Sequence, residues 1–119
     1  MVLASLDVGD PVAVVVWLDH WHARIARSEL GRRAVIEIDR EAESEAAYLQ
    51  RVAEAARDGR RLMVLGPDDE RLRFDRQYEA LYARRDRFVE VEAAPAVSPA
   101  ELIDRLRLLE GKGVSSPTG

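Results

Sequence analysis

The stretch VAVVVWL, residues 12–18, decides the fold of this chain. All of its residues are apolar, most of them are β-branched valines, and no charged residue interrupts it. A continuous apolar run of this kind is typical of a strand that is covered on both faces. The sequence therefore predicts that residues 12–18 form the central strand of a sheet between two layers of helices.

Two shorter segments after this strand alternate between apolar and polar residues. They are HARIARS, residues 22–28, and RAVIEI, residues 33–38, and a short polar link precedes each of them. Alternation combined with tight links is typical of antiparallel hairpins. We therefore expect two hairpins in series, which place the three strands side by side.

The pattern then changes to the spacing of a helix. The helical spacing lies within EAESEAAYLQRVAEAARDG, residues 41–59. The helix is predicted to end at Gly59, because glycine commonly stops a helix. One face of this helix is apolar and is expected to be buried. That face consists of Leu49, Val52, Ala53 and Ala56.

Strand and helix alternate again in the second half of the chain. Residues 61–65 and 88–91 are short and apolar, which predicts two further strands. A helix is expected between them, over residues 68–83. Its buried face is predicted to consist of Phe74, Tyr78, Leu81 and Tyr82.

The last helix has clear start and stop signals. Ser98 is the expected N-cap, Pro99 occupies the first helical position, and Glu101 completes a capping box. Gly111 is the predicted end of this helix.

This order of elements predicts an α/β fold of the ribonuclease-H-like type, with three layers. The mixed five-stranded sheet is expected in the order 3-2-1-4-5, with strand 2 antiparallel and helices on both faces. We expect one domain over residues 12–110. Residues 1–11 and 111–119 are rich in Gly, Ser and Pro without periodicity and are expected to be flexible ends.

The composition narrows the possible functions. With 119 residues, no cysteine and a formal net charge of −4, the chain has no disulfide framework, thiolate metal site or cysteine nucleophile. The charge balance argues against sequence-independent binding to nucleic acid through a basic domain. No apolar run is long enough for a membrane span, so we expect no membrane association and a cytoplasmic location.

The turn in RRLMVLGPDDERLRF, residues 60–74, is the first candidate site. A phosphate at Gly66 would lie at the amino terminus of a helix, which favours anions. However, Asp68, Asp69 and Glu70 occupy that position. These acids are better suited to capping the helix and to interacting with its dipole.

A metal site is the second candidate. In the nuclease form of this fold, two divalent ions are held by carboxylates after strand 1, on the first helix and after strand 4. The acids available at these places are Asp19, then Glu41, Glu43 or Glu45, then Asp68 or Asp69. Since Asp19 follows its strand and the strand itself contains no carboxylate, solvated acids are the favoured interpretation.

The segment DHWH, residues 19–22, offers a zinc site as a further alternative. His20 and His22 would point to the same side of a strand and could share a zinc ion with Asp19. The favoured interpretation is a hairpin turn in which Trp21 covers the sheet edge and both imidazoles face water. No serine lies in the context of a nucleophile elbow, and no catalytic residue is assigned.

The densest basic cluster lies on the second predicted helix and directly after it. Acidic residues alternate with these arginines, which favours a solvated, salt-bridged face; RNA or an acidic protein partner is the alternative. The candidate binding residues are Arg71, Arg73, Arg76, Arg84, Arg85 and Arg87.

Three stretches carry a resemblance to a known family: VVVWLDHWHARIARSELG, AEAARDGRRLMVLGP and FVEVEAAPAVSPAELIDRL. Together they resemble the central domain of the archaeal and eukaryotic peptide-chain release factor and Pelota superfamily, and more closely its small bacterial stand-alone relatives. The resemblance covers roughly residues 12–109. It implies the same fold and an association with the ribosome.

One departure from this family concerns activity. In release factors the loop between strand 3 and the first helix carries Gly-Gly-Gln, which helps water to cleave peptidyl-tRNA. Here the link over residues 39–43 contains neither glycine nor glutamine. Peptide release is therefore not expected.

These observations lead to one main hypothesis and two alternatives. We expect a non-catalytic binding module of the translation-machinery type, associated with the ribosome or RNA and without a cofactor. The first alternative is a metal-dependent nuclease or hydrolase that uses Asp19, His20, His22 and Asp68. The second is a homo-oligomeric structural protein without a small-molecule site, which would form a homodimer through an edge strand.

Overall fold

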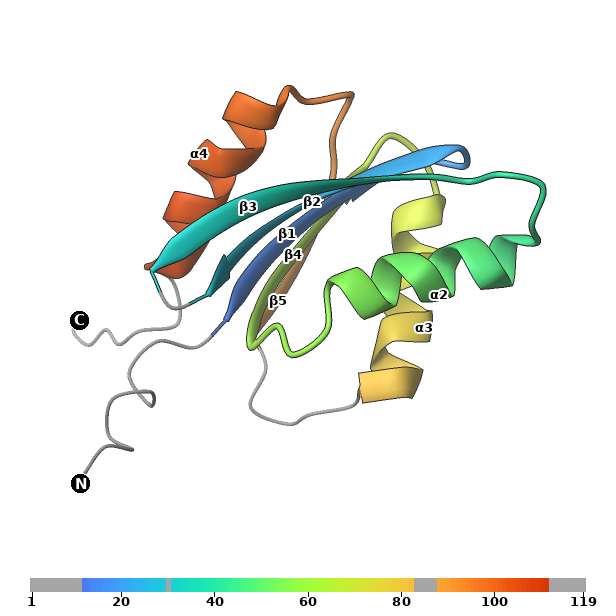
Figure 1. Ribbon diagram of the computed structural model, residues 1–119, viewed down its shortest axis with the longest axis horizontal. Coiled ribbons are helices and arrows are strands. Elements are labelled where there is room, and N and C mark those ends of the chain that lie inside the picture. The colour runs from blue at the N-terminus through green and yellow to red at the C-terminus, as the bar shows by residue number, and fades with distance from the viewer. Residues whose placement is uncertain (1–11, 30, 83–87, 112–119) are drawn as a thin grey trace.

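The computed structural model describes residues 12–29, 31–82 and 88–111 (Figure 1). The predicted flexible segments therefore lie outside the described residues, except for Gly111, which caps the last helix. The elements are β1 (Ala13–Leu18), β2 (His22–Glu29), β3 (Arg32–Asp39), α2 (Glu45–Ala55), β4 (Arg61–Gly66), α3 (Glu70–Tyr82), β5 (Phe88–Ala93) and α4 (Pro99–Glu110).

The sheet has the predicted topology. Its five strands follow the order β3-β2-β1-β4-β5. The pairs β1–β2 and β2–β3 are antiparallel, whereas β1–β4 and β4–β5 are parallel. The carboxyl ends of β1, β4 and β5 therefore meet at one edge of the sheet, together with the start of β2.

The central strand β1 is fully buried, as its apolar sequence predicts. Because side chains alternate along a strand, Val14, Val16 and Leu18 face one hydrophobic core. Ala13, Val15 and Trp17 face the second core, on the other side of the sheet.

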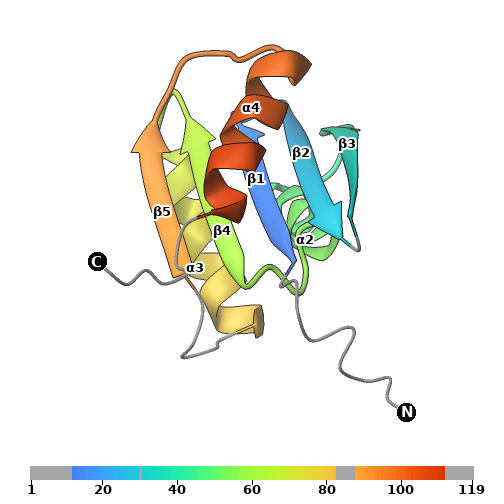
Figure 2. The ribbon, with the colours of Figure 1, turned by 90° about the vertical axis from the view of Figure 1, so that its left-hand side faces the viewer.

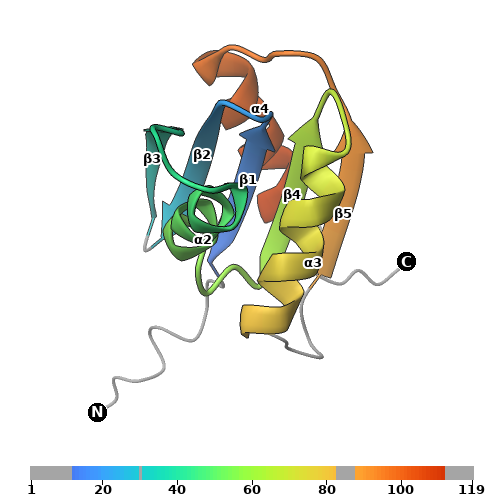
Figure 3. The same cartoon turned by 90° about the vertical axis from the view of Figure 1, so that its right-hand side faces the viewer.

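Helices cover both faces of the sheet. Figure 3 shows α2 and α3 on one face, and Figure 2 shows α4 on the opposite face. The predicted face of α2 is buried in the first core, and Tyr48 on the same helix is buried with it. On α4 the buried side chains are Leu102, Leu106 and Leu109.

Two predictions about the helices are wrong in detail. Helix α2 ends at Ala55, before Gly59, because the chain turns there through Ala56 and through Asp58 at a φ of 63°. Gly59 is instead buried against α3, where its N–H donates to the Tyr78 hydroxyl at 3.2 Å. On α3, Leu81 lies off the buried stripe and is 47% exposed.

The capping signals of α4 are confirmed. The Ser98 hydroxyl accepts a hydrogen bond from the N–H of Glu101 at 3.1 Å, and the Glu101 carboxylate accepts one from the N–H of Ser98 at 2.9 Å. Pro99 begins the helix and Gly111 caps its end.

None of the helices in the described part of the chain has the length and apolar character that crossing a bilayer requires.

Candidate functional site

The candidate site lies where β1 and β4 end and where α2 and α3 begin. Ligands of open α/β sheets commonly bind at the carboxyl ends of parallel strands. The backbones of β1 and β4 come close here, since a Cβ added to Gly66 would lie 2.5 Å from the carbonyl oxygen of Leu18. Gly66 therefore permits the close approach that brings the two following turns together.

The centre of this site is Glu70, the first residue of α3. Its side chain is completely buried, with a relative exposure of 0%. Oε1 lies 2.9 Å from Nδ1 of His20 and 3.1 Å from Nη1 of Arg73. Oε2 is buried and has no hydrogen-bond partner among the described residues.

Glu45, the first residue of α2, completes the cluster from a third element. Its Oε2 lies 3.1 Å from Nη1 of Arg73, so this arginine bridges Glu45 and Glu70. One ligand atom from each of His20, Glu45 and Glu70 lies within 4.8 Å of the others. These three side chains are placed to hold a metal ion.

Burial and the neighbouring carboxylate act together on Glu70. Burial raises the pKa of Glu70 above its ordinary value, and the interaction with the neighbouring Glu45 carboxyl group raises it further. The same interaction lowers the pKa of Glu45. Because the two shifts have opposite directions, Glu70 binds a proton more readily than Glu45 does.

The sequence did not single out Glu70, although a signal was present. Glu70 precedes Phe74 by four residues and Tyr78 by eight, and all three are buried along one stripe of α3. The spacing therefore placed a carboxylate on the apolar face of the helix. The prediction that Glu70 is a solvated capping acid is therefore wrong, because its side chain is buried.

Asp68 closes the turn before α3 through a side-chain hydrogen bond. Its Oδ1 accepts a hydrogen bond from the N–H of Glu70 at 3.0 Å, at the start of α3. Its Oδ2 lies 4.0 Å from Nε2 of His20. Asp68 is thus next to the cluster of His20, Glu45 and Glu70 without belonging to it.

The predicted zinc ligands of the segment at residues 19–22 are not brought together. Oδ1 of Asp19 accepts hydrogen bonds from the N–H groups of Trp21 and His22, both at 2.8 Å, and so closes the hairpin turn. His22 packs against Trp17, with ring centroids 5.4 Å apart, whereas His20 turns to Glu70. The alternative in which both imidazoles lie on one side of a strand required both histidines to belong to that strand, whereas only His22 belongs to β2.

The hairpin turn predicted at this segment is present, but Trp21 is mostly exposed rather than packed over the sheet edge. It is 65% exposed, and the guanidinium of Arg40 lies 5.5 Å from its ring centroid. A side chain of α2 also holds the turn in place, since the hydroxyl of the buried Tyr48 donates to the carbonyl oxygen of Asp19 at 2.9 Å. Burial raises the pKa of Tyr48, which keeps this hydroxyl protonated.

The described arginines of the predicted basic cluster have different roles. Arg73 pairs with the two glutamates, and Arg71 donates to the carbonyl oxygen of Asp68 in its own turn. Arg76 is exposed on α3. The remaining candidates, Arg84, Arg85 and Arg87, lie outside the described residues.

The link between β3 and α2 is short and held in place. It spans residues 40–44. The N–H of Arg40 donates to the carbonyl oxygen of Trp21 at 2.8 Å, and Nε of Arg40 lies 3.2 Å from the carbonyl oxygen of Glu43. Arg51 of α2 pairs with the Glu43 carboxylate at 2.6 Å.

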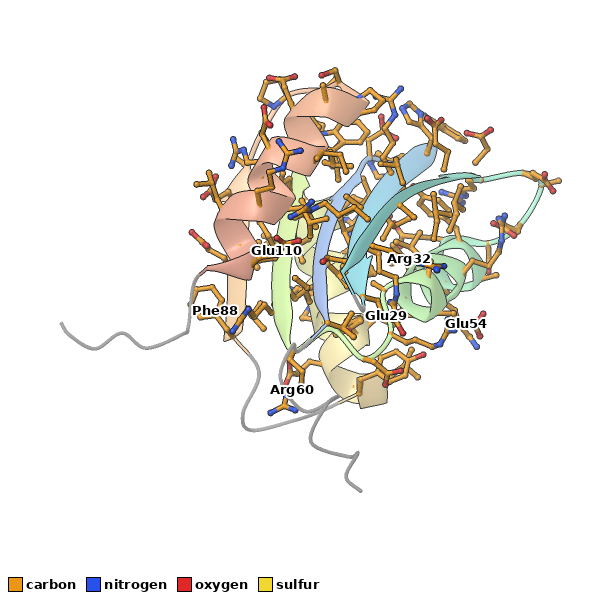
Figure 4. All side chains as sticks on the ribbon, turned by 60° about the vertical axis from the view of Figure 1, so that its left-hand side comes forward. Glu29, Arg32, Glu54, Arg60, Phe88 and Glu110 are labelled. Carbon is orange, nitrogen blue, oxygen red and sulfur yellow. The ribbon has the colours of Figure 1, made fainter. Side chains whose placement is uncertain are left out.

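A separate open cavity of about 470 Å³ lies at the opposite end of the sheet, lined by Arg27, Glu29, Arg32 and Ala34. Figure 4 shows Glu29 and Arg32 at this end of the sheet. Nη1 of Arg27 donates to the carbonyl oxygens of Ala55 and Arg57 at 3.1 and 2.7 Å. Arg27 therefore joins β2 to the end of α2.

Neither a family model nor a curated protein matches this sequence. Solved structures do match its fold. The Pelota protein of Archaeoglobus fulgidus superposes with a TM-score of 0.63 at 18% identity, over 88% of this chain and 33% of that one. The Pelota protein of Thermoplasma acidophilum gives a TM-score of 0.55 at 20% identity, over 85% of this chain and 34% of that one.

An archaeal translation termination factor also matches, with a TM-score of 0.51 at 14% identity, over 87% of this chain and 35% of that one. The chain thus spans about a third of the length of these three proteins. It has the fold of a Pelota- and release-factor-like domain, as its sequence motifs predicted.

Proposed function

We propose that this chain is a non-catalytic binding module of the translation-machinery type, which associates with the ribosome or its RNA in the cytoplasm. The observation that carries the proposal is the match of nearly the whole chain to one part of Pelota, supported by the match to a translation termination factor.

The link between β3 and α2 supports a role without peptide release. In release factors this connection carries the Gly-Gly-Gln loop, whereas here residues 40–44 form a short turn. Contacts of Arg40 and Arg51 hold the turn against the domain. The chain therefore lacks the Gly-Gly-Gln segment of the release factors at this connection.

We further propose that the arginines on and after α3 contact the ribosomal partner. Arg76 is exposed, and Arg84, Arg85 and Arg87 follow in the sequence. Arginines contact phosphate oxygens through paired N–H donors, which suits an RNA backbone. Arg73 is less available than Arg76, because its guanidinium is bound to Glu45 and Glu70.

Sucrose-gradient sedimentation of cell lysates tests this proposal. We expect tagged full-length chain to migrate with ribosomal particles at low salt and to return to the top of the gradient as salt increases. Treatment of the lysate with ribonuclease separates attachment to free RNA from attachment to the particles. Sedimentation entirely apart from ribosomal particles at low salt would refute the association.

A matched pair of variants tests the surface. The single charge reversal Arg76→Glu is expected to reduce the ribosome-bound fraction several-fold, since it removes a phosphate contact and introduces a negative charge in its place. The control is Arg107→Glu, because Arg107 is exposed on α4, on the opposite face of the sheet. An equal loss in the control would show that net charge alone determines the binding.

A further inference from the structure

Three separate elements place His20, Glu45 and Glu70 around one point. His20 follows β1, Glu45 begins α2 and Glu70 begins α3. Figure 3 shows α2 and α3 side by side on the same face of the sheet. The ligand atoms of the three residues lie within 4.8 Å of one another, a spacing that a single metal ion can bridge.

The buried carboxylate of Glu70 indicates that this cluster binds something. Its Oε1 is in contact with His20 and Arg73, but its Oε2 has no partner among the described residues and is shielded from water. A buried carboxylate oxygen without a partner is costly, and such groups commonly interact with a proton, a water molecule or an ion.

The local charge favours a cation. Glu45 and Glu70 carry two carboxyl groups, and among the described residues Arg73 is the arginine that contacts both. A single guanidinium balances only one of two ionised carboxylates. Binding of a divalent ion would allow both to be ionised while removing the unfavourable burial of a lone charge.

The ligand atoms indicate the class of metal. One imidazole nitrogen and two carboxylate oxygens form a mixed set that suits Zn²⁺ or Mn²⁺, whereas Mg²⁺ prefers oxygen ligands alone. We propose that His20, Glu45 and Glu70 form a binding site for one divalent transition-metal ion, with water completing its coordination.

Two further features support this site. The side chain of His20 is 44% exposed, so an ion can enter from solvent. Nδ1 of His20 faces Glu70, and Oδ2 of Asp68 lies 4.0 Å from Nε2. Asp68 therefore lies on the opposite side of the imidazole from Glu70, where carboxylates commonly orient a metal-bound histidine.

The rival explanation is a shared proton. A protonated Glu70 can donate to Glu45 and needs no metal ion. The two explanations differ in the role of His20. The metal ion needs its imidazole as a ligand, whereas the shared proton lies between the two glutamates and does not involve the imidazole. They also differ on Arg73, whose positive charge would oppose a bound cation.

Isothermal titration calorimetry of the full-length chain with ZnCl₂ and, separately, MnCl₂ tests the proposal. We expect one ion per chain for at least one of the two metals. Loss of an outer partner of a metal ligand already weakens affinity 10- to 100-fold. His20→Ala and Glu45→Gln, which each remove a direct ligand, are therefore expected to weaken binding by at least about tenfold.

The matched control is His22→Ala. His22 lies on the same hairpin with a similar exposure, 46% against 44% for His20, but it belongs to no metal-binding group among the described residues. The metal affinity of the His22→Ala variant is expected to equal that of the wild type. Circular dichroism of each variant confirms folding, and both His20 and Glu45 are exposed enough for replacement without a cavity.

Arg73→Ala provides a readout that a purely structural role would not produce. Removal of the competing positive charge is expected to make the metal bind more tightly than in the wild type. The proposal is overturned by any of three results. These are no binding of either ion, unchanged affinity in both His20→Ala and Glu45→Gln, or unchanged or weaker binding in Arg73→Ala.

Discussion

Gly66 ends β4 at the point where its backbone passes closest to β1. Because an added Cβ would lie 2.5 Å from the carbonyl oxygen of Leu18, one of the two strands would have to move. We expect Gly66→Ala to lower the free energy of unfolding by about 1–3 kcal/mol, as for other overpacked sites. Urea denaturation followed by circular dichroism measures this change.

Gly111→Ala is the control for this substitution. Gly111 has a helical conformation with φ −91°, and an added Cβ would be 3.8 Å from its nearest neighbour, the carbonyl oxygen of Leu108. Its effect is expected to stay within about 0.5 kcal/mol. A similar loss of stability in both variants would rule out the close approach of β1 and β4 as the cause.

Tyr78 shows how one hydroxyl can hold the end of a helix. It donates to the carbonyl oxygen of Ala56 at 2.6 Å and accepts from the N–H of Gly59 at 3.2 Å, and all three residues are buried. Tyr78→Phe leaves both backbone groups without this partner, so we expect a loss of about 1–3 kcal/mol in unfolding free energy.

Tyr48→Phe is the comparison, since the Tyr48 hydroxyl makes one hydrogen bond, to the carbonyl oxygen of Asp19. Its expected loss is smaller, about 0.5–1.5 kcal/mol. Thermal melts of both variants under the same conditions show which substitution destabilises the protein more. A larger loss of stability in Tyr48→Phe than in Tyr78→Phe would contradict the two hydrogen bonds assigned to the Tyr78 hydroxyl.

Helix α4 begins with the capping box of Ser98 and Glu101. Ser98→Ala removes the acceptor of the Glu101 N–H and is expected to destabilise the protein by about 1 kcal/mol. Ser98→Thr keeps a hydroxyl acceptor and should retain most of the stability. Equal destabilisation of the two variants would show that the cap contributes little.

The end of α4 is tied to β3 by an ion pair that responds to pH. Glu110, which Figure 4 shows at the end of α4, lies 2.7 Å from Nη2 of Arg33. The hydrogen bond with Arg33 lowers the pKa of Glu110 below its ordinary value of 4.5. A lowered pKa in the folded state means that the pair stabilises the protein above pH 4.5 and that this contribution is lost as the pH falls below it.

Glu110→Gln tests this pH dependence. The variant is expected to melt at a lower temperature than the wild type at pH 7, and the difference should shrink between pH 4.5 and more acidic values. The size of the effect is expected to be modest, because Arg33 is 37% exposed. A difference that stays constant with pH would exclude the ion pair as its cause.

At the scale of the whole molecule, the two edges of the sheet decide whether chains pair. The edge strand β3 carries Arg32, Arg33, Glu37 and Asp39, and β5 at the other edge carries Glu90 and Glu92. Charges on edge strands oppose pairing between chains. The homodimer, which the sequence left open as an alternative, therefore gains no support from the edge strands. We expect a monomer instead.

Light scattering tests the edges directly. We expect the mass of one chain over a wide range of concentration. A stable two-chain mass at low concentration would contradict this prediction and would favour pairing through β3, where Ile36 is 37% exposed.

The sequence by itself determined the order of elements, the sheet topology and the start of α4. These features depend on local signals: the apolar run of β1, the short hairpin links and the cap at Ser98. The predicted end of α2 at Gly59 failed because the fold uses that glycine for contact with Tyr78 rather than for a helix stop. A residue type alone does not distinguish the two uses.

Only the tertiary structure decided the candidate site. His20, Glu45 and Glu70 come from three distant parts of the chain and meet because β1 and β4 are parallel neighbours with helices on one face. The register of α3 buries Glu70, while the hairpin geometry sends His20 and His22 in different directions. Such contacts depend on strand pairing and helix rotation, which periodicity constrains only to within a residue or two. A rotation of that size determines whether a carboxylate faces water or the interior.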